Sequence, residues 1–171
     1  TLGIGVSAVV GVFEAVVEQI AVIMCFQSLI LGMAGNVGTQ SLAVTIRVLM
    51  DEDLTTTQKF QHIFKEGRIG VGNGILLGII SFLFIGGYIW LFKKYDLMFS
   101  FSVAGCVGIS LVFAMVISSL VGTMVPMFFH KIKIDPAVAS GPLITTINDL
   151  VAVISYYGLA WLLLIKLFQL G

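Results

Sequence analysis

Long runs without a charged residue dominate the hydrophobic pattern of this chain. A helix needs about 20 apolar residues to cross the hydrocarbon core of a bilayer, and three charge-free runs are long enough to do so alone, namely 19–46, 69–92 and 97–130. A fourth run, 136–168, is broken only by Asp149 and Lys166. The opening run, 1–13, would measure only about 20 Å as a helix, so we expect it to be the end of a truncated span.

This pattern predicts an all-α integral membrane protein that forms a single transmembrane domain over residues 1–171. Five transmembrane helices per chain are expected, at about 1–13, 18–49, 69–92, 98–129 and 137–168. The one substantial polar stretch, 50–68, is predicted to be a cytoplasmic connection with an interfacial helix. We expect the acids and bases of this connection, and His62 with them, to form a solvated face.

The composition indicates that lipid, rather than water, surrounds most of the chain. Hydrophobic residues make up 58% of the chain and charged residues 11%, whereas soluble domains carry roughly a quarter charged residues. Nine Lys and Arg balance nine Asp and Glu, which leaves no basic surface for a phosphate backbone and excludes nucleic-acid binding. The sequence shows no Ser-His pairing, GxSxG motif or His-rich cluster, so we expect no enzyme.

Lysine and arginine are distributed unevenly between the loops, and positive charge stays on the cytoplasmic side of a membrane. Six of them follow the second and fourth spans, namely Arg47, Lys59, Lys65, Arg68, Lys131 and Lys133. Three lie on the other side, namely Lys93, Lys94 and Lys166. The distribution predicts a protein of the plasma (inner) membrane with a cytoplasmic N-terminus and an external C-terminus.

Small residues at helical spacing predict close contacts between helices. Gly70, Gly74 and Gly78 recur every four residues in the third span. The fourth span carries a looser series that includes Ser118, Ser119 and Gly122. We interpret both series as packing surfaces and assign them no ligand.

Two segments combine backbone-breaking residues with polar side chains inside apolar runs. In 32–40, three glycines are expected to weaken the helix, and Asn36 and Gln40 lie one turn apart on one face. In 135–149, Asp135 is expected to cap a short turn before the span begins. Interrupted helices at membrane depth indicate an ion or substrate site, because protein or water must satisfy the freed carbonyls.

Asp149 is the strongest candidate for a functional residue. It follows a break at Gly141-Pro142 and continues a helix face with Thr145 and Thr146. A carboxylate at this depth costs roughly 2.5–3.5 kcal/mol on insertion scales, and the only basic residue inside a span is Lys166, near the far end of the same helix. An internal ion pair is therefore the weakest explanation, and a protonated acid, a wet pore and a bound cation stay open.

Oxygen donors such as Asp, Asn, Gln and Thr suit Mg²⁺, and Ca²⁺ and Mn²⁺ accept them as well. Mg²⁺ gives up its waters reluctantly, so one carboxylate per chain could hold a largely hydrated ion if a symmetric dimer doubled the charge. We therefore hypothesise a homodimer with a pore near its two-fold axis, where two copies of Asp149 face each other.

Two segments, GMAGNVGTQSLAVTIRVL (32–49) and DPAVASGPLITTINDL (135–150), resemble the signature segments of the MgtE magnesium channels. The resemblance implies a homodimeric, five-span cation channel related to the eukaryotic solute-carrier magnesium transporters. Members of that family also carry cytoplasmic regulatory domains, a superhelical domain and paired CBS domains, which are missing here. We expect the chain to be the membrane part trimmed from such a protein.

The resemblance also implies roles for individual residues. By position, Asp149 matches the pore aspartate of the TTxxD segment, and Asp135 matches an acidic residue near the cytoplasmic mouth. Thr145 falls where a backbone carbonyl would face the ion. The conducting-path segment of the second span is matched by Asn36, Gly38 and Gln40.

Three classes of function stay open on these residues. The first is a channel that passes a largely hydrated divalent cation down its gradient. The second is a secondary transporter in which Asp149 exchanges a divalent cation for sodium or protons. The third is a non-conducting membrane scaffold subunit in which Asp149 is neutral.

Overall fold

The computed structural model describes residues 2–14, 21–51, 55–139 and 142–167, and every regular element within them is helical. In chain order these elements are α1 (Leu2–Val12), the 3₁₀ turn η1 (Ala21–Ile23), α3 (Met24–Asp51), α4 (Thr56–Phe92), α5 (Leu97–Lys131), the 3₁₀ turn η2 (Pro136–Ala139), α6 (Pro142–Ala160) and the π-helical segment η3 (Trp161–Leu167). The prediction of an all-α protein is confirmed for this part of the chain.

Four of the described helical segments are long and apolar enough to cross a membrane. Their bounds are Ala21–Met50, Thr56–Phe92, Leu97–Lys131 and Leu143–Lys166. The remaining helix, α1, has 11 residues and is therefore only about 16 Å long. A fifth span that includes α1 stays a prediction.

Helix α4 extends well before the apolar run at 69–92. It begins at Thr56, so part of the polar stretch 50–68 continues directly into the span. A capping box starts the helix, in which the N–H of Gln58 donates to Thr55 Oγ1 (3.4 Å) and the N–H of Thr55 donates to Gln58 Oε1 (2.8 Å). With 37 residues, α4 is about 55 Å long, nearly twice the thickness of the hydrocarbon core.

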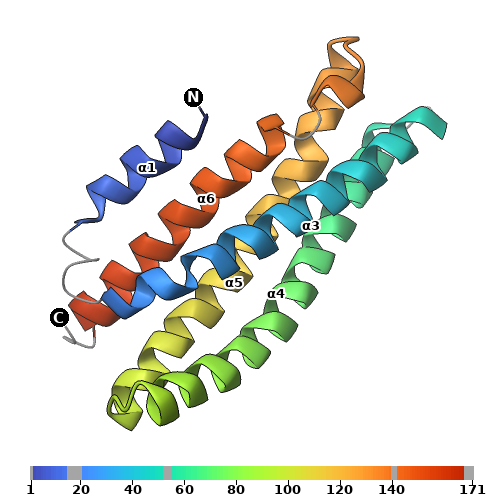
Figure 1. Cartoon of the computed structure of the whole chain (residues 1–171). Helices are drawn as coiled ribbons and strands as arrows, with labels where there is room; N and C mark the ends of the chain where they lie inside the picture. Colours follow the sequence, from blue (N-terminus) through green and yellow to red (C-terminus); the bar gives the residue numbers. More distant parts are fainter. Residues whose placement is uncertain (1, 15–20, 52–54, 140–141, 168–171) are drawn as a thin grey trace.

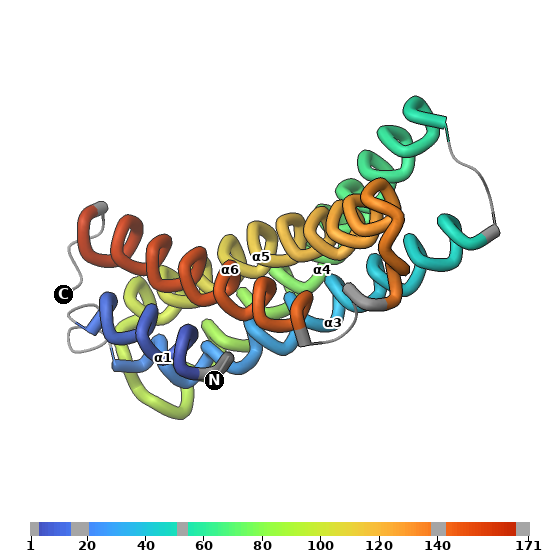
Figure 2. Tube along the Cα trace, turned by 90° about the horizontal axis from the view of Figure 1, so that it is seen from above, coloured from blue at the N-terminus to red at the C-terminus, as the bar shows by residue number. Residues whose placement is uncertain are grey.

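Helix α5 is the centre of the bundle. It contacts α3, α4 and α6, while α1 packs on the outer side of α6 (Figures 1 and 2). The Asp96 side chain caps its start by accepting a hydrogen bond from the N–H of Met98 at 2.9 Å. Because α5 has neighbours on several sides, its buried positions surround the helix, whereas many apolar side chains of α4 are exposed.

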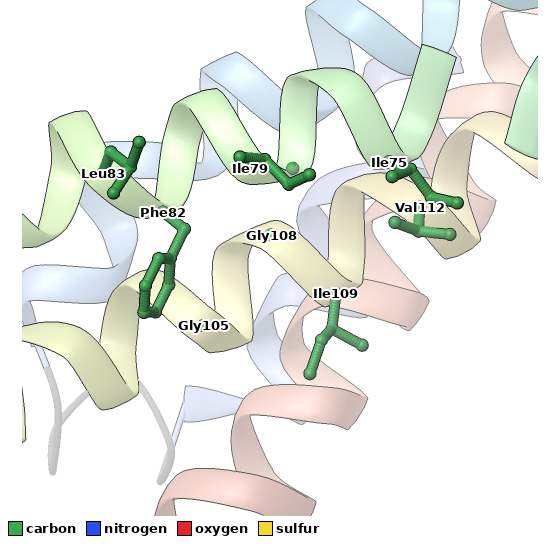
Figure 3. A pocket seen from close by; sticks show the side chains of 9 residues that line it. Ile75, Ile79, Phe82, Leu83, Gly105, Gly108, Ile109 and Val112 are labelled. Carbon is green, nitrogen blue, oxygen red and sulfur yellow. The ribbon is translucent and has the colours of Figure 1, made fainter. Parts of the chain in front are cut away.

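The backbones of α4 and α5 approach each other closely at glycines. A Cβ added at Gly74 would lie 2.8 Å from Val112 Cα, and one added at Gly78 would lie 3.0 Å from the carbonyl oxygen of Gly108. Figure 3 shows the outer side of this crossing, where apolar side chains of both helices line a shallow groove. The prediction of a packing surface along the glycines of the third span is therefore confirmed.

Two tyrosines fix α6 against the beginning of α3. Tyr156 Oη donates a hydrogen bond to the carbonyl oxygen of Ile23 at 2.7 Å. Tyr157 Oη donates to Gln27 Oε1 at 2.6 Å. Burying a tyrosine hydroxyl is favourable only when it finds such a partner, so these bonds set which residues of the two antiparallel helices lie opposite each other.

The glycine packing predicts a specific effect on stability. Gly74→Ala should lower the free energy of unfolding by about 1–3 kcal/mol, because the new methyl group overpacks the contact with Val112. Gly72→Ala is the matched control, since nothing lies within 4 Å of a Cβ at that position of the same helix. Thermal unfolding in detergent measures both variants. Equal midpoints for the two would contradict the close packing of α4 on α5.

Candidate functional site

The segment 32–40 lies in the middle of α3, and the expected weakening of the helix there is wrong. α3 is continuous from Met24 to Asp51. The reason is packing, since a Cβ added at Gly122 of α5 would collide with the carbonyl oxygen of Gly38. A glycine costs a helix about 1 kcal/mol relative to alanine, and here its absent side chain allows two backbones to meet.

The polar residues of this segment lie on the opposite face of α3. Gly38 is buried, whereas Asn36, Thr39 and Gln40 are exposed. The Thr39 hydroxyl is satisfied within the helix, because its Oγ1 donates to the carbonyl oxygen of Gly35 at 2.9 Å. The amides of Asn36 and Gln40 thus form a polar outer face that is exposed in the described part of the chain.

Asp135 caps a short turn, as the sequence predicts. Its Oδ1 accepts a hydrogen bond from the N–H of Ala137 at 2.9 Å, and the turn η2 begins at the intervening Pro136. The Asp135 side chain is exposed. Helix α6 begins at Pro142, and the Gly141 half of the predicted break lies outside the described residues.

Asp149 is half-buried on α6, one turn after Thr145 and close to the half-buried Thr146. Within the described ranges, no hydrogen bond or salt bridge joins its carboxylate to another side chain. Across the same part of the chain, no group of three or more His, Cys, Asp or Glu is positioned to hold a metal ion. The described residues of one chain therefore supply a single carboxylate here, and a cation at Asp149 would need water or a second chain to complete its shell.

Asn148 is not among the residues predicted for the site, and it is fully buried next to Asp149. Neither amide atom of Asn148 has a hydrogen-bond partner among the described residues. Its Nδ2 lies against Gly38, where an added Cβ would collide with it. An unsatisfied buried amide costs about 1–3 kcal/mol. The packing against Gly38 therefore holds the Asn148 side chain in an environment that is unfavourable for it. The sequence did contain a sign of this residue, because Asn148 is a second polar residue directly before Asp149 in an otherwise apolar run.

The contact between Gly38 and Asn148 brings the two signature segments together. Asp149 follows Asn148 directly, so it lies at about the height of Asn36 and Gln40 along the α3–α6 pair, which runs side by side in Figures 1 and 2. No described hydrogen bond joins Asp149 to either amide. Asp135 belongs to the loop between α5 and α6 and makes no described hydrogen bond to this group.

The chain is similar to known divalent cation transporters. Residues 27–159 match the model of the MgtE family, described as divalent cation transporters. The magnesium transporters MgtE of Bacillus subtilis, Enterococcus faecalis and Thermus thermophilus are 36%, 34% and 33% identical to this chain. The alignments cover 93%, 93% and 95% of the chain. They cover 33%, 33% and 34% of these relatives, so the chain spans about a third of their length.

The contact at Asn148 generates a prediction. Gly38→Ala should destabilise the protein by about 1–3 kcal/mol, because the methyl group collides with a side chain that is itself fully buried. Gly35→Ala is the control on the same helix, with nothing within 4 Å of the added atom. Adding Asn148→Ala should restore part of the stability lost in Gly38→Ala. Strictly additive unfolding free energies in this double-mutant cycle would argue against the contact.

Proposed function

This chain belongs to the MgtE family of divalent cation transporters, and we propose that it forms the ion-conducting membrane part of a magnesium channel. The observation that carries the proposal is the half-buried carboxylate of Asp149, which has no described hydrogen-bond or ion-pair partner and lies level with the polar outer face of α3. Burying a carboxylate without compensation is unfavourable. A passing cation and its water would supply the compensation.

The outward amides of Asn36 and Gln40 support a homodimer. Polar side chains are unfavourable toward lipid and are normally turned to other helices or to water. A second copy packed around a two-fold axis would enclose this face of α3, together with Asp149 from each chain. Two carboxylates would then balance the charge of one divalent ion, and their mutual repulsion would fall when the ion is bound.

Magnesium fits such a site through its hydration. Mg²⁺ retains several waters and is often held by only one or two carboxylates, and the donors available here are oxygens of Asp149, Thr145, Thr146, Asn36 and Gln40. In the proposed path the backbone carbonyl of Thr145 faces the ion. Ca²⁺ and Mn²⁺ accept the same donors, so they are the ions against which selectivity should be measured.

The proposed orientation places the N-terminus in the cytoplasm and the C-terminus outside the plasma membrane, because the side with more Lys and Arg stays inside. Asp135 then lies near the cytoplasmic mouth. Its carboxylate is exposed and uses Oδ1 to cap the turn η2, which leaves its negative charge available to attract cations toward the path.

The role of Asp149 can be tested by uptake. Asp149→Asn should reduce Mg²⁺ uptake into proteoliposomes roughly tenfold or more, which corresponds to at least about 1.4 kcal/mol, because the amide cannot balance the ion's charge. It should also abolish any rise of the thermal midpoint with added Mg²⁺. Asp96→Asn is the control, since Asn caps a helix as well as Asp does. Full uptake by Asp149→Asn would refute the proposed site, and uptake that requires a sodium or proton gradient would indicate coupled transport.

The homodimer can be tested by disulfide cross-linking in a background where Cys25 and Cys106 are replaced by Ser. Gln40→Cys should cross-link two chains in lipid, because the proposed two-fold axis brings the polar faces of α3 together. Ile79→Cys, on the apolar outer side of α4, is the matched exposed position that should not. Cross-linking through Ile79→Cys alone would place the dimer interface on α4 and contradict the proposed pore.

A further inference from the structure

The first turns of α4 have different surroundings on different sides. Ser41 Oγ of α3 donates to Glu66 Oε2 at 2.9 Å, and Ser119 Oγ of α5 donates to the backbone carbonyl oxygen of Glu66 at 2.6 Å. Glu66 is only 4% exposed, so the expectation that it belongs to a solvated face is wrong. Its carboxylate belongs to the contact with α3, and a separate groove lies between the beginning of α4 and the end of α5.

This groove has a volume of about 390 Å³ and is lined by side chains of both helices. Its walls include Lys59, Phe60 and Ile63 of α4 and Met124, Phe128 and Lys131 of α5. Among the described residues, those that line it include two lysines and no acid. The groove shown in Figure 3 lies farther along the same two helices, and its lining residues carry no polar side chain. The two grooves therefore differ in charge.

Charge and hydrophobicity are ordered along the groove. α4 and α5 are consecutive antiparallel helices, so the first turns of α4 lie beside the last turns of α5 (Figure 1). Lys59 and Lys131 therefore lie at the same end of the groove. Toward the middle of the helices, Ile63 follows Lys59 by one turn. Met124 precedes Lys131 by two turns, or about 10 Å. The groove thus changes from cationic to apolar in the direction that leads from the end of the helix pair into the bilayer.

The apolar side of the groove is exposed in the described part of the chain. The side chains of Phe60, Phe128 and Met124 are 68%, 58% and 46% exposed. Lys59 is half-buried and Lys131 is exposed, and within the described ranges no carboxylate is paired with either ammonium group. Lysine can lay its apolar stem along such a wall while its charge stays at the polar surface. A ligand that fits both parts has an apolar chain and an anionic group.

We propose that the groove binds an anionic phospholipid, whose phosphate lies between Lys59 and Lys131 and whose acyl chain follows the apolar wall toward Met124. Phospholipids in a bilayer have the same order, with the phosphate at the surface and the chains in the core. Basic pockets between transmembrane helices bind such headgroups. The ammonium of a zwitterionic headgroup would add a third cation beside the two lysines, so a lipid with a net negative charge is favoured.

The bound lipid contacts both helices and therefore stabilises the pairing of α4 with α5, because a ligand that binds only the folded state raises its stability. The groove of Figure 3 offers no cation, so it accepts an acyl chain without regard to the headgroup. Binding at Lys59 and Lys131 does not rest on the proposed transport function. Only the assignment of the lipid to the cytoplasmic leaflet rests on the proposed orientation.

Lipid titration of the purified chain in detergent tests the headgroup contact. Phosphatidylglycerol should raise the thermal midpoint more than phosphatidylcholine with identical chains, because only the former carries a net negative charge. Lys59→Gln combined with Lys131→Gln should weaken the affinity for phosphatidylglycerol roughly tenfold or more and remove this preference. Lys93→Gln combined with Lys94→Gln is the matched control, because it removes the same charge from exposed positions beyond the opposite end of α4. An unchanged preference in the first variant, or an equal loss in the control, would overturn the proposal.

A photoreactive phosphatidylglycerol, with its reactive group in the acyl chain, locates the site in the unmodified protein. It should label the last turns of α5 and the first turns of α4, and phosphatidylglycerol should compete better than phosphatidylcholine. Glycerol phosphate lacks the chains, so it should neither compete nor raise the midpoint at the same concentrations. Labelling confined to other helices, or equal competition by glycerol phosphate, contradicts a phospholipid site. Neither readout involves Mg²⁺ uptake, so loss of uptake in Asp149→Asn leaves both unaffected.

Discussion

At the crossings of α5 with α3 and α4, backbone meets backbone with almost no side chain between them. A methyl group added at Gly122 would collide with the carbonyl oxygen of Gly38, and one added at Gly78 would lie only 3.0 Å from the carbonyl oxygen of Gly108. Lipid chains are as apolar as leucine, so the hydrophobic effect does little to hold helices together inside a bilayer. Dispersion between closely packed atoms must do so, and it falls steeply with separation. The glycine contacts therefore decide the rotation of each helix around α5.

The rotation of α3 has the largest consequence for function. Because Gly38 and Ser41 are turned inward to meet α5, α6 and α4, the amides of Asn36 and Gln40 must point outward. One helix thus has a packed face and a polar face at the same depth. On the inner face of α3, Gly38 packs against Asn148 and Ser41 is hydrogen-bonded to Glu66. The position of the polar outer face therefore depends on contacts that other residues of α3 make.

Several features were predictable because they depend on local chemistry. The long apolar runs predict the helical class. The glycine series beginning at Gly70 predicts the contact of α4 with α5. The capping side chain of Asp135 predicts the turn that follows it. Two expectations failed where the environment outweighed local preference. The glycines of 32–40 do not break α3, because α5 packs against them, and Glu66 is buried because serines of two other helices surround it.

The sequence by itself determined where helices form and which residues share a face, since both follow from hydrophobic run length and from the 3.6-residue period. It also singled out Asp149 as an acid without a nearby base. Only the tertiary structure decided which face of each helix is covered. In an apolar solvent a polar residue such as Asn148 or Glu66 can lie inside, and an amide such as Gln40 can lie outside. Polarity therefore does not mark the surface as it does in water, and the covered face is set by where neighbouring backbones can approach.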